Sequence, residues 1–382
     1  MRLVYVCGGD CSVFESQVME LLDYYQQTGI DVTLFEGYST EDERVSLEKK
    51  ILRHASIRVI WFKTYPFYPI FLYASIKAFQ EALYKMNDLS DVRFHVRGGF
   101  QGYLVCEAIR KDNIELPVLV DIRGVRVEEM KYLIVRQTGF RRLLSKIQLF
   151  FFKRMTHKFY MGNYPQVSIT SVSPVINDYF HFSYAECLYP MYVHPNIAGL
   201  AFEYSEEQRH QIRNEFHIGL SEVVAICATG GNGLWQKDYQ IIEHLVKQGI
   251  KVINLSKEKI DIEGVISTIV PFSQMPAMLS AADIAVLWRD DTFINQSASP
   301  SKFSEFAAMG LYVIHNGSVA VATQYLKESG AGLIVRDMAE ICNLPSLQYL
   351  HNHRAKWIAD GKKAFGVMEI GCSLLRCLKI EV

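Results

Sequence analysis

The stretch SASPSKFSEFAAMGLYVIHN, from Ser297 to Asn316, predicts a short helix that leads into a buried strand. Ser299 is a suitable N-cap, Pro300 fits the first helical position, and Gly310 is typical of a helix C-terminus. The apolar run LYVIH that follows is typical of a strand in a parallel sheet, where both faces are covered. The stretch therefore predicts one helix–strand unit of an α/β fold.

Two charged residues occupy unusual positions in this helix. Lys302 lies in the first turn, where the helix dipole disfavours a cation by about 0.3–1 kcal/mol, so an anion such as phosphate is expected to bind there. The alternative is that the Lys302 side chain turns into solvent. Glu305 lies one turn later among apolar neighbours, where its carboxylate could accept hydrogen bonds from two ribose hydroxyls. The alternative for Glu305 is a structural ion pair with Lys302 or with Arg289.

The same alternation of strand and helix extends outward over the chain and predicts parallel, doubly wound sheets. The predicted strands lie at 2–6, 31–35, 57–62, 92–98, 117–124, 222–230, 250–255, 265–272, 283–288, 311–315 and 331–335.

The alternation is interrupted near 191–199, where the flanking sequence has two prolines and no clear periodicity, which predicts a linker. The sequence therefore predicts two Rossmann-like domains, 1–193 and 194–382, whose sheets face an interdomain cleft. The last helix of the chain is a candidate to pack back on the N-terminal domain.

Composition excludes several classes of protein. A chain of 382 residues favours two domains, and a net charge of −1 gives no support for nucleic-acid binding. The eight cysteines are scattered without a C-x-x-C pair, which predicts free thiols in a reducing compartment and a cytoplasmic protein. No P-loop, G-x-G-x-x-G fingerprint, metal-ligand spacing or Ser/His/Asp arrangement stands out.

Residues 131–177 contain eight basic residues and no acidic residue. Within this segment, 139–155 places six apolar side chains on one broad helical face: Phe140, Leu143, Leu144, Ile147, Phe150 and Phe151. A basic amphipathic helix can lie on an anionic membrane, so peripheral membrane contact through 131–160 is one interpretation. A helix that packs on the core with a basic rim is the other.

Glycine-containing turns follow two of the predicted strands. TGGNGLWQKD, residues 229–238, lies between a strand and a helix, and glycines such as Gly231 allow backbone amides to approach a phosphate. Lys237 repeats, at a second helix start, the position of Lys302. CGGDCS, residues 7–12, is a similar turn in the N-terminal half.

Charged side chains also lie at two strand ends of the N-terminal half, where they are expected to face the cleft. These are His95, Arg97, Asp121 and Arg123. Each is a candidate for function, although strand-end charges are also often capped or paired residues.

The C-terminal half resembles the retaining family 4 glycosyltransferases of the GT-B fold. The matching stretches are 270–287 (VPFSQMPAMLSAADIAVL), 299–314 (SPSKFSEFAAMGLYVI) and 329–335 (SGAGLIV). The stretch 188–202 is similar to the interdomain linker of that family. DIRG, the basic helix after it and 168–180 (SITSVSPVINDYF) resemble the N-terminal domain of bacterial surface-polysaccharide members.

The resemblance implies a retaining, metal-independent transferase of the hexosyltransferase type. It implies transfer of a sugar from a nucleotide-sugar donor to a glycan acceptor, lipid-linked at the inner membrane face, in polysaccharide biosynthesis. The donor is expected on the C-terminal domain, with Glu305 on the ribose and Lys302 and Lys237 on the diphosphate. The acceptor is expected on the N-terminal domain, and no cofactor is expected.

The candidate site residues follow from these observations together. The donor-binding set is Glu305, Lys302, Lys237, Gly231, Ser301, Ser297 and Asn295, and the catalytic candidates near the donor sugar are Asp121, Arg123 and His95.

The sequence departs from the family pattern in two places. The first of the two motif glutamates falls at Ser297, and the arginine before the lysine of the glycine-rich loop has no clear equivalent, with Asn232 and Gln236 in that region. The alternative function is therefore a catalytically degenerate GT-B protein that acts as a partner or glycan-binding subunit. A sugar-nucleotide epimerase is a further alternative.

Overall fold

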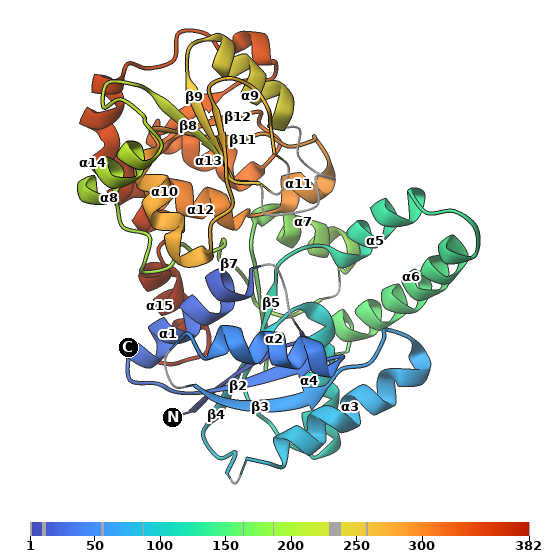
Figure 1. The fold of residues 1–382 in the computed structure, drawn as a ribbon. Helices are drawn as coiled ribbons and strands as arrows, with labels where there is room; N and C mark the ends of the chain where they lie inside the picture. The colour runs from blue at the N-terminus through green and yellow to red at the C-terminus, as the bar shows by residue number, and fades with distance from the viewer. Residues whose placement is uncertain are drawn as a thin grey trace. The chain divides into compact units, whose positions relative to one another are not determined.

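The structure is a computed structural model that describes residues 2–9, 13–54, 57–86, 88–162, 164–185, 187–228, 238–256 and 259–381 (Figure 1). The chain divides into two compact units. The N-terminal unit comprises Met1–His194 together with Gly371–Val382, and the C-terminal unit comprises Pro195–Ile370.

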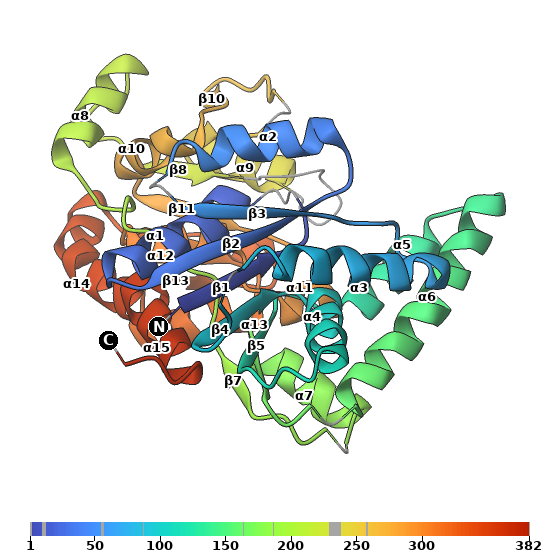
Figure 2. The ribbon, with the colours of Figure 1, turned by 90° about the horizontal axis from the view of Figure 1, so that it is seen from below.

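The N-terminal unit is built on a seven-stranded parallel sheet in the order β3-β2-β1-β4-β5-β6-β7 (Figure 2). Its strands are β1 (Arg2–Cys7), β2 (Asp31–Tyr38), β3 (Arg58–Lys63), β4 (Val92–Arg97), β5 (Val118–Ile122), β6 (Val167–Ser171) and β7 (Met191–Val193). Its helices are η1 (Glu15–Met19), α1 (Glu20–Gln27), α2 (Glu41–Ile51), α3 (Pro69–Leu83), α4 (Gly99–Lys111), α5 (Arg126–Val135), α6 (Gly139–Tyr160), α7 (Pro174–Ser183) and the end of α15 (Val367–Cys377).

The C-terminal unit has a six-stranded parallel sheet in the order β10-β9-β8-β11-β12-β13. Its strands are β8 (Val224–Cys227), β9 (Lys251–Asn254), β10 (Val265–Ser267), β11 (Ile284–Leu287), β12 (Tyr312–His315) and β13 (Gly332–Ile334). Its helices are α8 (Glu206–Glu215), α9 (Asp238–Lys247), η2 (Phe272–Gln274), α10 (Met275–Ala281), α11 (Phe293–Ser297), α12 (Ser301–Ala308), α13 (Ala320–Ser329), η3 (Met338–Glu340) and α14 (Leu347–Phe365).

The inner strands of both sheets are short apolar runs that are buried on both faces, as parallel sheets covered by helices require. In β1, β5, β8 and β11 every residue is buried except Arg2. The two parallel, doubly wound sheets that the sequence predicts are therefore confirmed.

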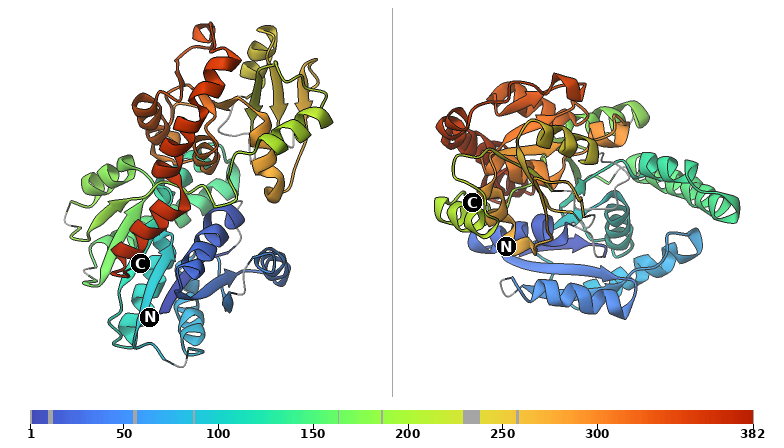
Figure 3. Two further views of the ribbon diagram at one scale, coloured as in Figure 1. Left: turned by 90° about the vertical axis from the view of Figure 1, so that its left-hand side faces the viewer. Right: turned by 45° about the horizontal axis from the view of Figure 1, so that its top comes forward.

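The end of α15 packs on α1 within the N-terminal unit (Figure 3). A methyl group at Gly371 would lie 2.5 Å from the ring of Tyr24, so only glycine allows this close approach. Ser373, also on α15, has its Oγ 2.9 Å from Nε2 of His194.

Helix α12, which the sequence predicts to begin at Pro300, begins one residue later, at Ser301. Pro300 is the N-cap of α12, whereas Ser299, expected at the cap, accepts a hydrogen bond at its Oγ from the Asn196 N–H at 2.9 Å. The prediction for Gly310 is confirmed. Its φ is +65°, and the N–H groups of Gly310 and Leu311 donate to the carbonyls of Ala307 and Phe306 in a Schellman arrangement.

The segment 191–199 is not the irregular linker that the sequence predicts throughout. Met191–Val193 form β7, which pairs with β6, because three residues of extended chain complete the edge of the sheet. Asn196 then binds the start of α12, since its carbonyl accepts a hydrogen bond from the Ser304 hydroxyl at 2.6 Å.

A buried ion cluster ties α8 and α14 to the start of β11. The Asp283 carboxylate accepts hydrogen bonds from Arg209 and from Arg213, each at 2.7 Å, and Nη2 of Arg354 lies 3.5 Å away. Arg209 also donates to the carbonyls of Ser280, Ala281 and Ala282 at the end of α10. The Asp283 carboxylate therefore pairs with the buried arginine charges, and Arg209 also supplies a hydrogen-bond donor to the last carbonyls of α10.

His194 gives the N-terminal unit a predicted dependence on pH. Its ring is held between Thr170 and Ser373, and burial lowers its pKa from 6.5 to about 4. A lowered histidine pKa stabilises the fold fully above pH 6.5, and this stability is lost as the pH falls toward 4. We expect the protein to lose about 2 kcal/mol between pH 7 and pH 5 through this residue.

The measurement is chemical denaturation at both pH values for the protein and for His194→Gln, which keeps polar atoms in place but cannot be protonated. The variant should lose less stability on acidification. Equal losses in the two proteins would contradict the assignment.

Candidate functional site

In the C-terminal unit, the predicted donor-binding residues that the structure describes lie on α11 and α12, which follow β11. β8 and β11 are neighbours, and the sheet is extended from them in opposite directions, by β9 and β10 on one side and by β12 and β13 on the other. The carboxyl ends of strands at such a switch point are where ligands bind in doubly wound folds. α11 and α12 follow β11 at this switch point.

Glu305 and Lys302 form the centre of this site. The Lys302 Nζ donates to Glu305 Oε2 at 2.7 Å, so of the two ion pairs weighed for Glu305 the one with Lys302 is present. Arg289 instead donates from Nη1 to Oδ1 of Asn295 at 3.3 Å. The expectation that Lys302 turns into solvent is wrong, because its side chain is only 22% exposed.

The ion pair leaves half of the Glu305 carboxylate unsatisfied. Glu305 is fully buried, and its Oε1 has no hydrogen-bond partner among the described residues. Burial raises the pKa of Glu305, and Lys302 opposes that shift. A buried carboxylate oxygen without a donor is costly, so this atom marks a position where a hydroxyl or amide of a ligand would be stabilised.

The other donor-binding candidates that the structure describes are Asn295, Ser297 and Ser301, and they differ in burial. Asn295 and Ser297 are buried and bonded within their own loop: Asn295 Nδ2 donates to the Asp290 carbonyl at 2.8 Å, and Ser297 Oγ to the Ile294 carbonyl at 3.2 Å. Ser301 is half-buried at the first turn of α12. Gly231 and Lys237 lie outside the described residues.

In the N-terminal unit the switch point lies between β1 and β4. The structure brings the three catalytic candidates together here. The Asp121 carboxylate accepts a hydrogen bond from Arg123 Nε at 2.7 Å, and His95 Nε2 lies 3.5 Å from the same oxygen. The Tyr25 hydroxyl lies 3.3 Å from the other ring nitrogen of His95.

This cluster is buried except at Arg123. His95 and Asp121 are fully buried, and burial lowers the pKa of His95. Burial alone would raise the pKa of Asp121, but Arg123 and His95 outweigh it, so the pKa of Asp121 is lowered. A carboxylate held ionised in this way fixes the guanidinium of Arg123 at the edge of the cluster.

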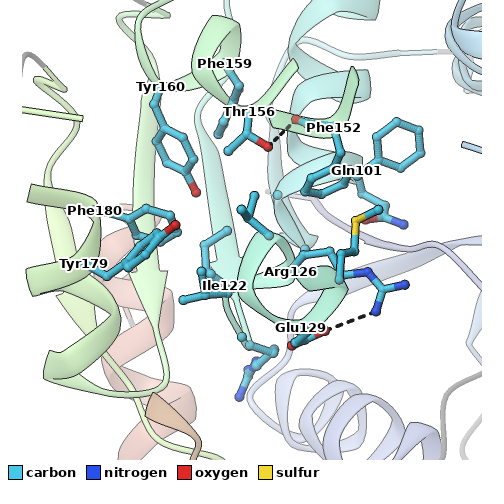
Figure 4. Close-up of a pocket in the computed structure, with 18 of the residues that line it drawn as sticks. Gln101, Ile122, Arg126, Glu129, Phe152, Thr156, Phe159, Tyr160, Tyr179 and Phe180 are labelled. Atoms are coloured by element: carbon cyan, nitrogen blue, oxygen red, sulfur yellow. Dashed lines mark hydrogen bonds and ion pairs between the residues drawn. The ribbon is translucent and has the colours of Figure 1, made fainter. Parts of the chain in front are cut away.

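Arg123 lines a cavity of about 420 Å³ between the ends of β4 and β5 and the helices α6 and α7. Figure 4 shows the side chains of this first cavity, with the Tyr160 ring pointing into it and Tyr179 and Phe180 on one wall. Polar groups from Gln101, Arg126, Glu129 and Thr156 lie among the rings. The first cavity therefore combines aromatic faces with hydrogen-bonding groups, as sites for small polar molecules do.

The aromatic walls of the first cavity are functional candidates that sequence reasoning does not find. Tyr160 lies on α6, Tyr179 and Phe180 lie on α7, and Tyr184 directly follows α7. Aromatic side chains in such positions are typical of an ordinary core. No local pattern in the sequence marks these side chains, because the cavity arises from the packing of α6 and α7 beside β5.

The helix α6 is confirmed, but its apolar face is only partly covered. Its C-terminal third packs on the core through Phe152, Met155, Phe159 and Tyr160. Before Phe152, Phe140 is 72% exposed and Phe150 60% exposed, and Leu143 and Ile147 are exposed as well. The interpretation of α6 as a core-packing helix therefore fails for its first half, which extends away from the sheet with α5 (Figures 1 and 3).

The described residues give no sign of a membrane-spanning helix or of a metal site. None of the described helices is long and apolar enough to cross a membrane. Within the same residues, no group of three or more His, Cys, Asp and Glu side chains is arranged to hold a metal ion.

The chain matches no protein-family model and no curated protein sequence. Its structure, however, is similar to solved structures. A glycosyltransferase from Rickettsia africae matches with a TM-score of 0.65 at 11% identity, over 99% of this chain and 97% of that one. HepE from Anabaena, in complex with UDP and glucose, matches with a TM-score of 0.64 at 10% identity, over 99% of each chain.

Sucrose-phosphate synthase from Thermosynechococcus elongatus is also similar, with a TM-score of 0.62 at 12% identity over 99% of this chain and 98% of that one. At such low identities the similarity shows the fold and not the reaction. The fold is GT-B-like, with two units that each carry a parallel α/β sheet, as in these solved structures.

Proposed function

We propose that the protein is a retaining glycosyltransferase that moves a hexose from a nucleotide-sugar to a glycan acceptor. The observation that carries the proposal is the fully buried Glu305, paired with Lys302 through one oxygen and unpartnered at the other among the described residues. This carboxylate lies at the switch point of a GT-B-like fold, and a solved structure of that fold, HepE, holds UDP-glucose. Ribose hydroxyls would supply the missing donors.

The diphosphate of the donor is proposed to bind beside Glu305. The first turn of α12 offers backbone N–H groups and the half-buried Ser301, and Lys302 adds a positive charge. Lys237 and Gly231 are proposed to complete the site. Charge on the leaving diphosphate is then neutralised by side chains and the helix, so we propose that neither a metal nor another cofactor is needed.

The acceptor is proposed to bind in the first cavity of the N-terminal unit. Its aromatic walls suit the apolar faces of sugar rings, and Arg123, Gln101 and Glu129 suit their hydroxyls. Arg123 is the member of the buried cluster that reaches the cavity, so we assign it contact with substrate. Asp121 and His95 then act as positioning residues that hold Arg123.

A second candidate function is a catalytically degenerate protein that binds glycan or a partner. It is favoured by Ser297, which stands where the family motif has its first glutamate and whose hydroxyl is already bonded to the Ile294 carbonyl. A serine so placed cannot supply a carboxylate to the donor sugar.

The test is ¹H NMR of sugar released from UDP-glucose, with water as the acceptor. We expect slow release of UDP and of glucose whose first-formed anomer is α, as in the donor. At donor concentrations below Kd, release by Glu305→Gln should be slower by about 10- to 150-fold. EDTA should leave the rate unchanged. If UDP-, GDP-, ADP- and CMP-sugars all stay intact and none is transferred to a glycan, the degenerate candidate holds.

Peripheral membrane contact through 131–160 is part of this proposal, because it would bring a lipid-linked acceptor to the protein.

We expect the protein to float with phosphatidylcholine vesicles only when about 30% phosphatidylglycerol is present, since exposed apolar groups and basic residues act together on anionic surfaces. Serine at Phe140, Leu143, Ile147 and Phe150 should abolish flotation. Serine at Leu52, Phe182 and Leu188, exposed apolar residues outside α6, should not. Equal flotation of both variants would contradict the proposal.

A further inference from the structure

A second cavity, of about 480 Å³, lies on the other side of α6 from the first. It is enclosed by α3, α4, α6 and the segment before α3. Its walls are chiefly apolar, with Phe67, Leu72, Phe100, Phe151 and Met155 contributing to them. A cavity of this size and lining suits a flexible hydrocarbon chain.

One rim of the second cavity is positively charged. Arg154, His157 and Lys158 all come from α6. Lys158 is engaged, since its Nζ donates to the Tyr103 hydroxyl at 3.0 Å and lies 3.5 Å from the Glu107 carboxylate. Arg154 is exposed and has no hydrogen bond or ion pair with any other described residue. Its guanidinium is therefore available for an anion at the mouth of an apolar cavity.

The two cavities share a wall. Phe67 and Phe100 line both cavities, and their rings pack edge to face with their centroids 4.8 Å apart. Phe67 also packs edge to face on Phe152, at 4.9 Å, next to Gln148, whose Nε2 donates to the Phe67 carbonyl at 3.1 Å. One amphiphilic molecule can thus place its hydrocarbon chain in the second cavity and a sugar of its head group on the other side of Phe67, in the first cavity.

We propose that the second cavity binds the single hydrocarbon chain of a lipid phosphate, with the phosphate on Arg154. The inference rests on the proposed function, because this lipid would be the anchor of the glycan acceptor whose sugar end enters the first cavity. A phosphate is the anion of choice because the arginine fork binds it through two parallel hydrogen bonds. The exposed apolar half of α6 would bring the mouth of the cavity to the membrane surface that holds such lipids.

The probe is dodecyl phosphate, titrated below its critical micelle concentration by calorimetry without nucleotide. We expect saturable binding of one molecule per chain and a negative change in heat capacity, the mark of buried apolar surface. Each methylene removed should weaken binding about fourfold, so octyl phosphate, which is four methylenes shorter, should bind about 250-fold more weakly. Inorganic phosphate should not compete.

Variants of the protein distinguish binding of the hydrocarbon chain from binding of the phosphate. Arg154→Gln should weaken dodecyl phosphate about tenfold and leave 1-decanol unaffected, because only the charged hydrogen bonds are lost. Arg142→Gln, on the same helix and outside the cavity, should change neither. Leu72→Trp should fill the cavity and remove binding of both probes.

Equal effects of Arg154→Gln and Arg142→Gln, or unchanged binding in Leu72→Trp, would overturn the proposal. These outcomes are independent of the proposed function, because donor binding at Glu305 is measured with nucleotide-sugars alone. A failed titration beside intact donor binding rejects only the lipid site.

Discussion

Asp283→Ala is expected to lower the free energy of unfolding by about 3–5 kcal/mol. The substitution leaves Arg209, Arg213 and Arg354 buried around an absent carboxylate. Burial already lowers the pKa of Arg213 and of Arg354, with Asp283 as the main opposing influence, so these charges depend on that one anion. The measurement is urea denaturation followed by circular dichroism.

The matched control for Asp283 is Asp360→Ala in the same unit. Asp360 forms an ion pair with Lys356 at 2.7 Å, but both side chains are exposed to solvent. Its loss should change the free energy of unfolding by no more than about 0.5 kcal/mol. Similar effects of the two substitutions would show that the buried cluster does not stabilise the C-terminal unit.

Glu305→Gln is expected to weaken nucleotide-sugar binding by about 10- to 150-fold, the range for hydrogen bonds to a charged group. Glutamine keeps the shape of the side chain but removes its negative charge. That charge strengthens the proposed hydrogen bonds from the ribose hydroxyls and the ion pair with Lys302. Calorimetric titration of the donor measures the effect. Glu328→Gln, an exposed residue bonded to Gln324 on α13, is the control and should bind donor normally.

A structural role for Glu305 makes a different prediction. If the carboxylate only anchors Lys302, then Glu305→Gln should lower the stability of the free protein and leave donor affinity unchanged at a temperature where the variant is folded. Loss of affinity without unfolding supports the ribose assignment, and unchanged affinity contradicts it.

The sequence predicts the sheets well because their signal is local. Apolar runs of four to six residues alternate with helical patterns, and Gly310 ends α12 as its position predicts. The N-cap of α12 is predicted one residue early because Ser299 is used elsewhere. Its hydroxyl accepts from Asn196, which lies 103 positions away in the chain, and no local pattern shows that contact.

The arginines of α8 also make contacts that a local sequence pattern does not predict. The segment from Ser205 is strongly polar in sequence, yet Arg209 and Arg213 are buried on Asp283. Only the packing of α8 on α10 and α14 shows this, because burial of a charge depends on a partner that is distant in sequence.

The candidate sites are predictable in part. The sequence suggests both a ribose contact and an ion pair with Lys302 for Glu305. The structure shows the ion pair, together with a second carboxylate oxygen that has no hydrogen-bond partner in the described part of the chain. It also places His95, Asp121 and Arg123 at strand ends, where they meet. The strand order that creates the two switch points, and the aromatic cavities on either side of α6, depend on long-range packing and leave no local pattern.

The most direct test of the central claim is a thermal-shift screen against UDP-, GDP-, ADP- and CMP-sugars, with and without Glu305→Gln. A ligand that binds only the folded protein stabilises it by about 2.7 kcal/mol at a hundredfold excess over Kd. We predict that one nucleotide class raises the melting temperature and that Glu305→Gln, at the same ligand concentration, reduces the stabilisation to about 0.3–1.4 kcal/mol. No shift with any class, or the same shift in the variant, would contradict a nucleotide-sugar site at Glu305.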